Sequence, residues 1–144
     1  MWSAEYQKEF IGIEVKSIWN AWVDVNNWPK WDKELEKTLL ESPFEIGTKF
    51  LLKPKGGPNV TIEITEINPL KTFTAVARFP LAEMHNFHEL IETENGLIIK
   101  SKISVTGALG WLWRIIVVQG VTDVVPKQLE ELVNYVKKAE AKTR

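Results

Sequence analysis

Two histidines and a neighbouring glutamate are the side chains of this sequence best suited to moving protons. His85 and His88, the only histidines, lie three residues apart, and Glu89 follows directly. On the strand that we predict for this segment, residues three apart point to opposite faces, so the two histidines cannot bind one metal ion together. Zinc sites need further His, Cys or acidic ligands, and no motif of that kind occurs in the sequence. We therefore predict no metal site, and proton transfer remains the chemistry to consider.

The turn at Asn95-Gly96 decides which of these side chains faces the interior. A three-residue turn with Gly96 in the left-handed conformation pairs Thr93 with Leu97, whereas a two-residue turn pairs Glu94 with Leu97. The first register buries more apolar surface, and the hydrophobic pattern sets the register of a strand pair. We therefore favour the three-residue turn.

The favoured register directs His85, Phe87 and Glu89 inward, and the alternative register directs His88 inward instead. Burial disfavours a carboxylate, so an inward Glu89 would have a raised pKa and could act as a general base beside His85. In the competing interpretation both histidines are ordinary polar groups, and Glu89 faces solvent opposite Lys102. His85 and Glu89 are thus the candidate catalytic residues.

Alternating apolar and polar residues predict the strands that would carry these side chains. Between residues 33 and 107, turn-forming pairs such as Asn68-Pro69 separate segments that are apolar at every second position. Val60, Ile62 and Ile64, for example, alternate with threonine and glutamate. This pattern is typical of an antiparallel sheet with one covered face. Together with a first strand over residues 5–13, we predict seven strands.

Helical spacing predicts two short helices after the first strand and one long helix at the end. Residues 14–25 place apolar side chains on one stripe, and a second short helix follows with Pro29 in its first turn. The long helix covers residues 111–141, and we expect Pro126 to kink or interrupt it. Its first half is apolar on nearly all sides, so one side must contact something other than the sheet.

The composition predicts one domain without covalent cross-links. A chain of 144 residues can bury roughly 70% of the surface that it exposes when unfolded, so we predict a single domain over residues 1–144. The absence of cysteine excludes disulfides and fits a cytoplasmic protein, and no signal peptide is recognised. The net charge of −1 argues against nucleic acid as a partner. The longest stretch without Asp, Glu, Lys or Arg has 11 residues, too short for a membrane-spanning helix.

The order of the predicted elements, together with several short motifs, resembles the START-like superfamily, also called SRPBCC. The motifs are the run 15–19 leading to residues 24–31, Gly47-Thr48 before the third strand, Asn95-Gly96 before the last strand and Gly107 before the final helix. The resemblance implies an α+β helix-grip fold, in which a curved seven-stranded antiparallel sheet wraps the long C-terminal helix and leaves a cavity between them. Members include polyketide cyclases, lipid-transfer domains and plant hormone-binding proteins, and most of them bind apolar ligands.

The function expected from this resemblance is binding of an apolar small molecule or lipid in that cavity, without a cofactor. One alternative is an enzyme similar to polyketide cyclases and dehydratases that uses His85 and Glu89, and another is a co-chaperone-like interaction module. The scarcity of polar groups at the predicted cavity positions favours binding over catalysis. The predicted ligand-binding residues lie on the strands and on the final helix: Ile62, Ile64, Phe73, Ala75, His85, Phe87, Ile99, Ile103, Trp111, Trp113, Val117 and Val124.

Overall fold

The computed structural model describes residues 2–142, with the exception of the side chains of residues 117–119. The predicted order of a strand, two short helices, six strands and a helical C-terminal segment is confirmed. The elements are β1 (Trp2–Ile11), α1 (Val15–Val23), the 3-10 helix η1 (Val25–Lys30), β2 (Leu35–Leu39), β3 (Lys49–Pro54), β4 (Val60–Asn68), β5 (Thr72–Phe79), β6 (Ala82–Glu92), β7 (Gly96–Thr106), α2 (Gly110–Trp113), the π-helical segment η2 (Arg114–Val118) and α3 (Gln119–Lys142).

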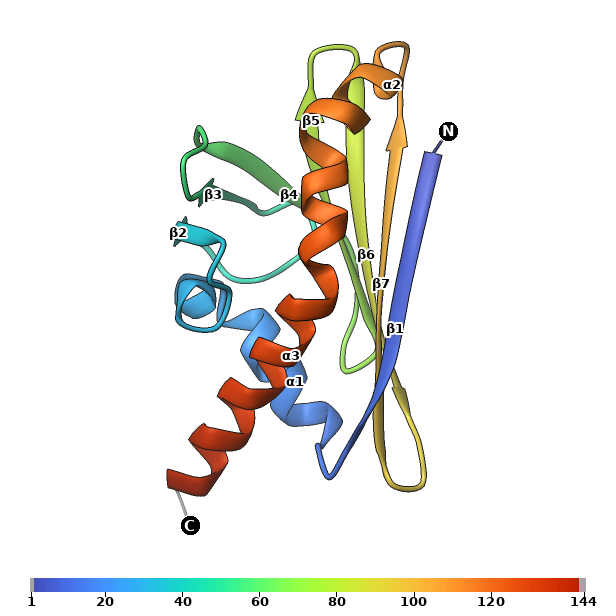
Figure 1. Ribbon diagram of the computed structural model, residues 1–144. Coiled ribbons are helices and arrows are strands. Elements are labelled where there is room, and N and C mark those ends of the chain that lie inside the picture. Colours follow the sequence, from blue (N-terminus) through green and yellow to red (C-terminus); the bar gives the residue numbers. More distant parts are fainter. Residues whose placement is uncertain (1, 143–144) are drawn as a thin grey trace.

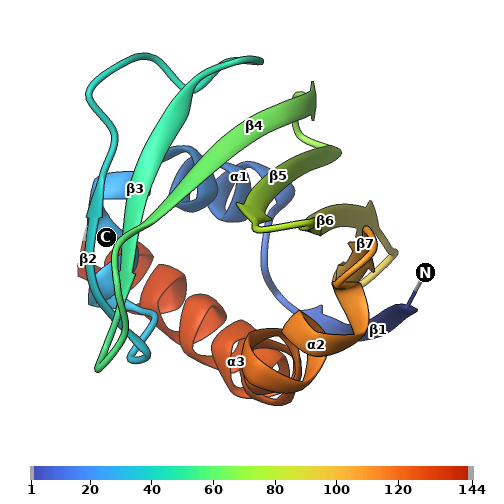
Figure 2. The same ribbon diagram turned by 90° about the horizontal axis from the view of Figure 1, so that it is seen from above.

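The seven strands form one antiparallel sheet in the order β1-β7-β6-β5-β4-β3-β2. The sheet curves around α3, which lies along its concave side (Figure 1). Figure 2 shows the strands as an arc that α3 and α1 close. The predicted helix-grip fold is therefore confirmed, and none of the described helices is long and apolar enough to span a lipid bilayer.

The concave face of the sheet and one stripe of α3 form the core. Along β7, buried and half-buried residues alternate strictly, as expected of a strand with one covered face. In the second half of α3, Leu129, Leu132, Val133 and Val136 have the spacing of one helical stripe, and at most 4% of each residue is exposed. Burial of such apolar stripes is the main favourable term in folding.

The pairing of β6 with β7 differs from both predicted registers. Glu92 lies opposite Leu97 and His88 lies opposite Ser101, and residues 93–95 connect the two strands. This register puts Glu89 beside Lys100 on the convex face, whereas the favoured three-residue turn would have placed the Glu89 carboxylate inside. The prediction of that turn was wrong, because keeping charged side chains out of the core outweighs the extra apolar burial.

The C-terminal segment is helical from Gly110, but it is not one regular helix. The irregularity lies in η2, whereas α3 continues without interruption through Pro126. The predicted interruption at Pro126 is therefore wrong, and the kink given as its alternative stays a prediction. The buried stripe downstream of Pro126 holds α3 against the sheet, and tertiary packing of this kind offsets the loss of one helical hydrogen bond.

Gly96 provides a test of the close approach between β1 and β7. A Cβ atom at this position would lie 2.0 Å from the backbone oxygen of Phe10, whereas one at Gly120 would meet nothing within 4 Å. We expect Gly96→Ala to lower the free energy of unfolding by about 2 kcal/mol or more, because two backbones must separate. Gly120→Ala is the matched control, and it should be neutral or stabilising by up to about 1 kcal/mol, since alanine favours a helix. Urea unfolding of the two variants tests this, and equal stabilities would contradict it.

Candidate functional site

A cavity of about 210 Å³ lies between the concave face of the sheet and α3. Its sheet wall comes from alternate residues of β3 to β7, among them Phe73 and Ala75 of β5. Its second wall comes from α3 and from the segment around η1, which contributes Trp28 and Trp31. The lining is mostly apolar and aromatic, with a few polar side chains, as is typical of small-molecule sites.

The structure distributes the predicted ligand-binding residues over several locations. Ile62, Phe73, Ala75, Ile103 and Val124 line the cavity.

Of the other predicted residues, those whose side chains the structure describes do not line it. Ile64 and Ile99 are fully buried in the core beside the cavity. Trp111 is 63% exposed, and Trp113 stacks on Phe79, itself a lining residue, with ring centroids 4.9 Å apart. The side chain of Val117 lies outside the described part of the chain.

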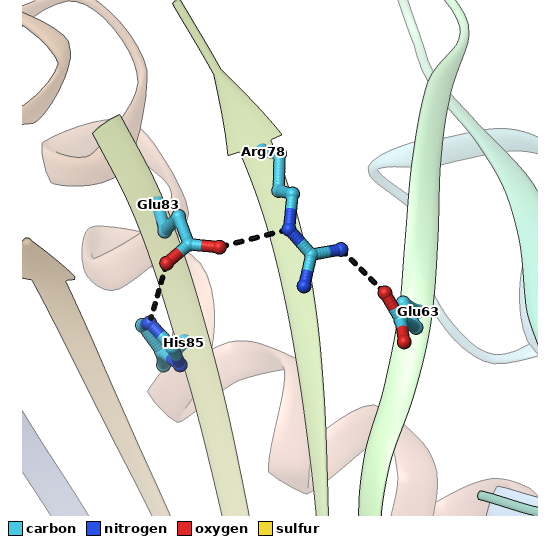
Figure 3. Close-up of polar contacts among 4 residues, drawn as sticks. All are labelled: Glu63, Arg78, Glu83 and His85. Carbon is cyan, nitrogen blue, oxygen red and sulfur yellow. Dashed lines mark hydrogen bonds and ion pairs between the residues drawn. The ribbon is translucent and has the colours of Figure 1, made fainter. Parts of the chain in front are cut away.

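The predicted catalytic residues lie on the convex face of the sheet, which corrects their expected inward orientation. His85 belongs to an ion-pair network there (Figure 3). Its Nε2 lies 3.8 Å from Glu83, whose other carboxylate oxygen accepts a hydrogen bond of 2.8 Å from Arg78 Nε. Arg78 also pairs with Glu63. This network is half-exposed to solvent and faces away from the cavity, so His85 cannot act on a molecule bound inside.

Glu89 and Phe87 share that outward orientation. Glu89 lies 3.9 Å from Lys100 across the strand pair, and its side chain remains about one-third exposed, at 32%. The alternative interpretation, with Glu89 facing solvent beside a lysine of the last strand, agrees with this placement, although the lysine is Lys100 and not Lys102. Phe87 lies opposite Lys102 on the same face. The cavity therefore contains none of the acid–base groups expected from the favoured register.

His88 is the histidine that faces the cavity. Its Nδ1 lies 3.2 Å from Ser101 Oγ, and its ring stacks on Phe73 at 4.6 Å between centroids. Trp22 contacts both rings, with its centroid 5.5 Å from that of His88 and 5.1 Å from that of Phe73. Burial lowers the pKa of His88 to about 4, because the charged imidazolium would lose its hydration. The ring is therefore neutral at pH 7, and its remaining accessible surface faces the cavity, which Asn86 of the same strand also lines.

Asp32 supplies a carboxyl group to the opposite wall. It follows η1, is only 4% exposed, and lines the cavity. Gln128 of α3 donates a hydrogen bond of 2.5 Å to Asp32 Oδ2, and the backbone N–H of Glu34 donates one of 3.1 Å to Oδ1. Burial raises the pKa of Asp32 above its usual value, and the Gln128 hydrogen bond partly offsets this effect.

Three aromatic rings line the cavity together with Asp32 and meet one another at steep angles, so that they form a corner. Trp28 and Trp31 meet at 55° with centroids 6.2 Å apart, and Trp28 meets Phe50 at 86° and 5.4 Å. The Trp28 indole N–H donates to the backbone oxygen of Trp22, so its hydrogen bond is made within the protein. The Trp31 indole nitrogen is buried and has no hydrogen-bond partner among the described residues.

The sequence analysis gave an inward His88 only as the less favoured alternative, and it missed Asn86, Ser101 and Asp32 as lining residues. Met84, Asn86, His88 and Leu90 alternate with Glu83 and Glu89, and a comparison of formal charge on the two faces would have identified the inner set. No comparable signal marks Asp32, because its burial depends on contacts with distant Gln128. Among the described residues, no group of three or more His, Cys, Asp or Glu side chains could hold a metal ion.

No protein-family model matches the sequence, and no curated protein matches it significantly. Solved structures do resemble the fold. The START superfamily protein from Mycobacterium smegmatis is 10% identical, with a TM-score of 0.66 over 99% of each chain. Ara h 8.0201 is 16% identical, with a TM-score of 0.72 over 95% of this chain and 99% of that one.

The di-domain ARO/CYC StfQ from the steffimycin biosynthetic pathway is 11% identical, with a TM-score of 0.73 over 96% of this chain and 52% of that one. Identities this low establish the shared fold alone. The predicted START-like (SRPBCC) fold is thus confirmed.

His88 should make the stability of the protein depend on pH. Its pKa is about 4 in the folded protein and about 6.5 in the unfolded chain, so the unfolded chain binds more protons between these values. The contribution of His88 is complete above pH 6.5 and falls by about 3 kcal/mol as the pH drops to about 4. Urea unfolding at pH 7.5 and pH 5.0 should show about 2 kcal/mol of this loss in the wild type and a smaller loss in His88→Gln.

His85→Gln is the matched control, because His85 lies half-exposed on the convex face. It should retain the pH dependence of the wild type. If His85→Gln and His88→Gln flatten the dependence equally, the burial assigned to His88 is wrong.

Proposed function

We propose that this protein binds a compact, largely apolar small molecule in the cavity between the sheet and α3. The observation that carries the proposal is the cavity itself, whose apolar walls hold a few buried polar side chains directed at its interior. Buried polar groups cost free energy unless they are hydrogen-bonded, and a ligand that engages them recovers part of that cost. The binding role predicted from the sequence therefore remains the preferred function.

The size of the cavity limits the ligand. Sites for drug-sized molecules have volumes of roughly 300–1,000 Å³, and the volume here is about 210 Å³. Aromatic residues at its walls, Phe73, Phe50 and Phe79 among them, leave little room for a long acyl chain. We therefore favour a ligand of one or two rings over a lipid with long chains.

The ligand series phenol, 2-naphthol and 1-hydroxypyrene tests this limit. Affinity should rise from phenol to 2-naphthol as more apolar surface is buried, and it should fall for 1-hydroxypyrene, which exceeds the space. Trp22, Trp28 and Trp31 line the cavity, so intrinsic fluorescence reports the titration. An affinity that continues to rise with 1-hydroxypyrene would contradict a small enclosed site.

Ala75→Leu should weaken 2-naphthol binding by about tenfold or more, because it fills the cavity from the sheet wall. Thr74→Leu is its control, since Thr74 is a neighbour on the same strand and bonds to Glu66 on the other face. Equal losses in both variants would mean that the naphthol binds elsewhere.

A second candidate function is acid–base catalysis in the same cavity, and the observation that favours it is Asp32. Burial raises the pKa of Asp32 and makes it a stronger base than an ordinary carboxylate, whereas burial lowers the pKa of His88 to about 4 and makes it a weaker base than an ordinary histidine. The di-domain ARO/CYC StfQ shares the fold, which is compatible with this alternative.

Proton exchange on a compact ketone tests the catalytic alternative. If Asp32 acts as a general base, the protein should accelerate deuterium exchange at the activated CH₂ of 2-tetralone in D₂O by about 10²-fold, as followed by NMR. Asp32→Asn should abolish the acceleration, and Glu36→Gln, which alters an exposed acid paired with Lys53, should preserve it. Binding of 2-tetralone without acceleration would favour a purely binding function.

A further inference from the structure

We propose that the ligand of this cavity is an organic cation, an arylalkyl ammonium or quaternary ammonium compound, held in the corner formed by Trp28, Trp31, Phe50 and Asp32. This inference rests on the proposed binding function and names its ligand class. It follows from the aromatic rings, the carboxyl groups and the charge of the lining side chains.

The first observation is the arrangement of the rings. Trp28 meets Trp31 at 55° and Phe50 at 86°, so the three rings form a corner and not a flat wall. A group placed in a corner contacts more than one ring at once. The π faces of aromatic rings attract cations, most strongly when the site is shielded from water, and quaternary ammonium groups are typical ligands of such sites.

The second observation is the sign of the charge at the lining. Asp32 and Glu34 are the ionisable acids among the lining residues, and no described lysine or arginine lines the cavity. His88 is neutral above about pH 5 and adds no positive charge. An anionic ligand would have no described cation to pair with inside, and it would meet the Asp32 carboxylate.

The two acids lie at different depths. Asp32 is 4% exposed and is held by Gln128 and by the backbone of Glu34, whereas the Glu34 side chain is exposed at the cavity edge. Asp32 keeps its orientation through these contacts, so little side-chain freedom is lost when a cation binds. Burial takes water away from the Asp32 carboxylate and so destabilises its negative charge. An ammonium group beside it would stabilise that charge again.

Lysines near the cavity edge do not reverse this preference. Lys53 alternates along β3 with the lining residues Leu52 and Pro54, and its ammonium pairs with Glu36 at 2.7 Å. The Lys33 ammonium contacts the backbone oxygen of Lys30. These charges lie on the surface, where water and salt screen them, and the preference for a cation comes from contacts inside.

Two probes of nearly equal shape separate charge from apolar burial. Benzyltrimethylammonium carries a positive charge, and neopentylbenzene is its neutral carbon analogue. Titrations followed by intrinsic fluorescence at pH 8 should show that both probes bind to the wild type and that phenylacetate, an anion, does not. The deciding quantity is the change in each affinity when one charge or one ring is removed.

Asp32→Asn should weaken benzyltrimethylammonium by at least about tenfold and change neopentylbenzene by less than about twofold. Phe50→Leu, which removes a ring and keeps an apolar side chain, should weaken the cation by about threefold or more, with a smaller effect on the neutral probe. Glu34→Gln should weaken the cation slightly, and the matched control Glu36→Gln should change neither probe. Glu34 is exposed, so its variant keeps the test valid if Asp32→Asn does not fold.

The outcomes separate this inference from the proposed binding function. The cation preference is wrong, and the apolar site stands, if Asp32→Asn weakens the binding of both probes equally. If Asp32→Asn does not fold, the same result with Glu34→Gln has the same meaning. The cation preference is also wrong if phenylacetate binds as tightly as benzyltrimethylammonium. The same holds if only the neutral probe binds to the wild type. If neither benzyltrimethylammonium nor neopentylbenzene binds, and 2-naphthol also does not, the binding function itself is overturned.

Discussion

The pairing between β6 and β7 determines which side chains this fold can use inside its cavity. Every inward residue of β6 lies opposite an inward residue of β7, as His88 does opposite Ser101, and a shift by one residue would exchange the two faces of β6. The observed pairing places Glu83 and Glu89 on the convex side, where Arg78 and Lys100 lie beside them. The cost of burying two carboxylates makes the shifted pairing unfavourable.

That constraint accounts for the character of the cavity. The β6 residues that line the cavity carry no formal charge at neutral pH. Two of them, Asn86 and His88, contribute hydrogen-bonding groups to a sheet wall that is otherwise mostly apolar. Desolvation keeps His88 neutral, and a neutral imidazole stacked on Phe73 is compatible with apolar neighbours. The single buried carboxyl group of the lining, Asp32, comes from the opposite wall, where Gln128 and a backbone N–H bond to it.

Much of the fold could be predicted from the sequence, because its signals are local. Alternation along segments such as 60–64 and 97–105 identified strands, and the stripe of leucine and valine in α3 identified the face that packs on the sheet. The connection at residues 93–95 escaped prediction because Asn95-Gly96 is compatible with several turn lengths, each with its own register. Formal charge on the two faces of β6 carries the missing information, and apolar content alone does not.

The site could be predicted only in its apolar part. Ile62, Phe73, Ala75 and Ile103 line the cavity because they share the concave face that strand alternation defines.

The aromatic corner and Asp32 depend instead on how the segment after α1 packs against α3, which involves residues nearly a hundred positions apart. Helical and strand periodicity carry no information on such contacts. The sequence around η1 shows tryptophans beside an aspartate, and the contacts of Asp32 and Lys33 with Gln128 and Glu131 of α3 join this segment to the helical wall of the cavity.

The two walls of the cavity therefore impose different requirements on a ligand. The sheet wall offers an apolar surface with neutral hydrogen-bonding groups at His88, Asn86 and Ser101, which discriminate little between ligands of different charge. The wall at η1 and α3 combines aromatic rings with the carboxyl group of Asp32, and this wall does discriminate by charge. Shape selection and charge selection thus reside on separate elements. A substitution on β5 can change the size limit without altering the charge preference, and a substitution after η1 can do the reverse.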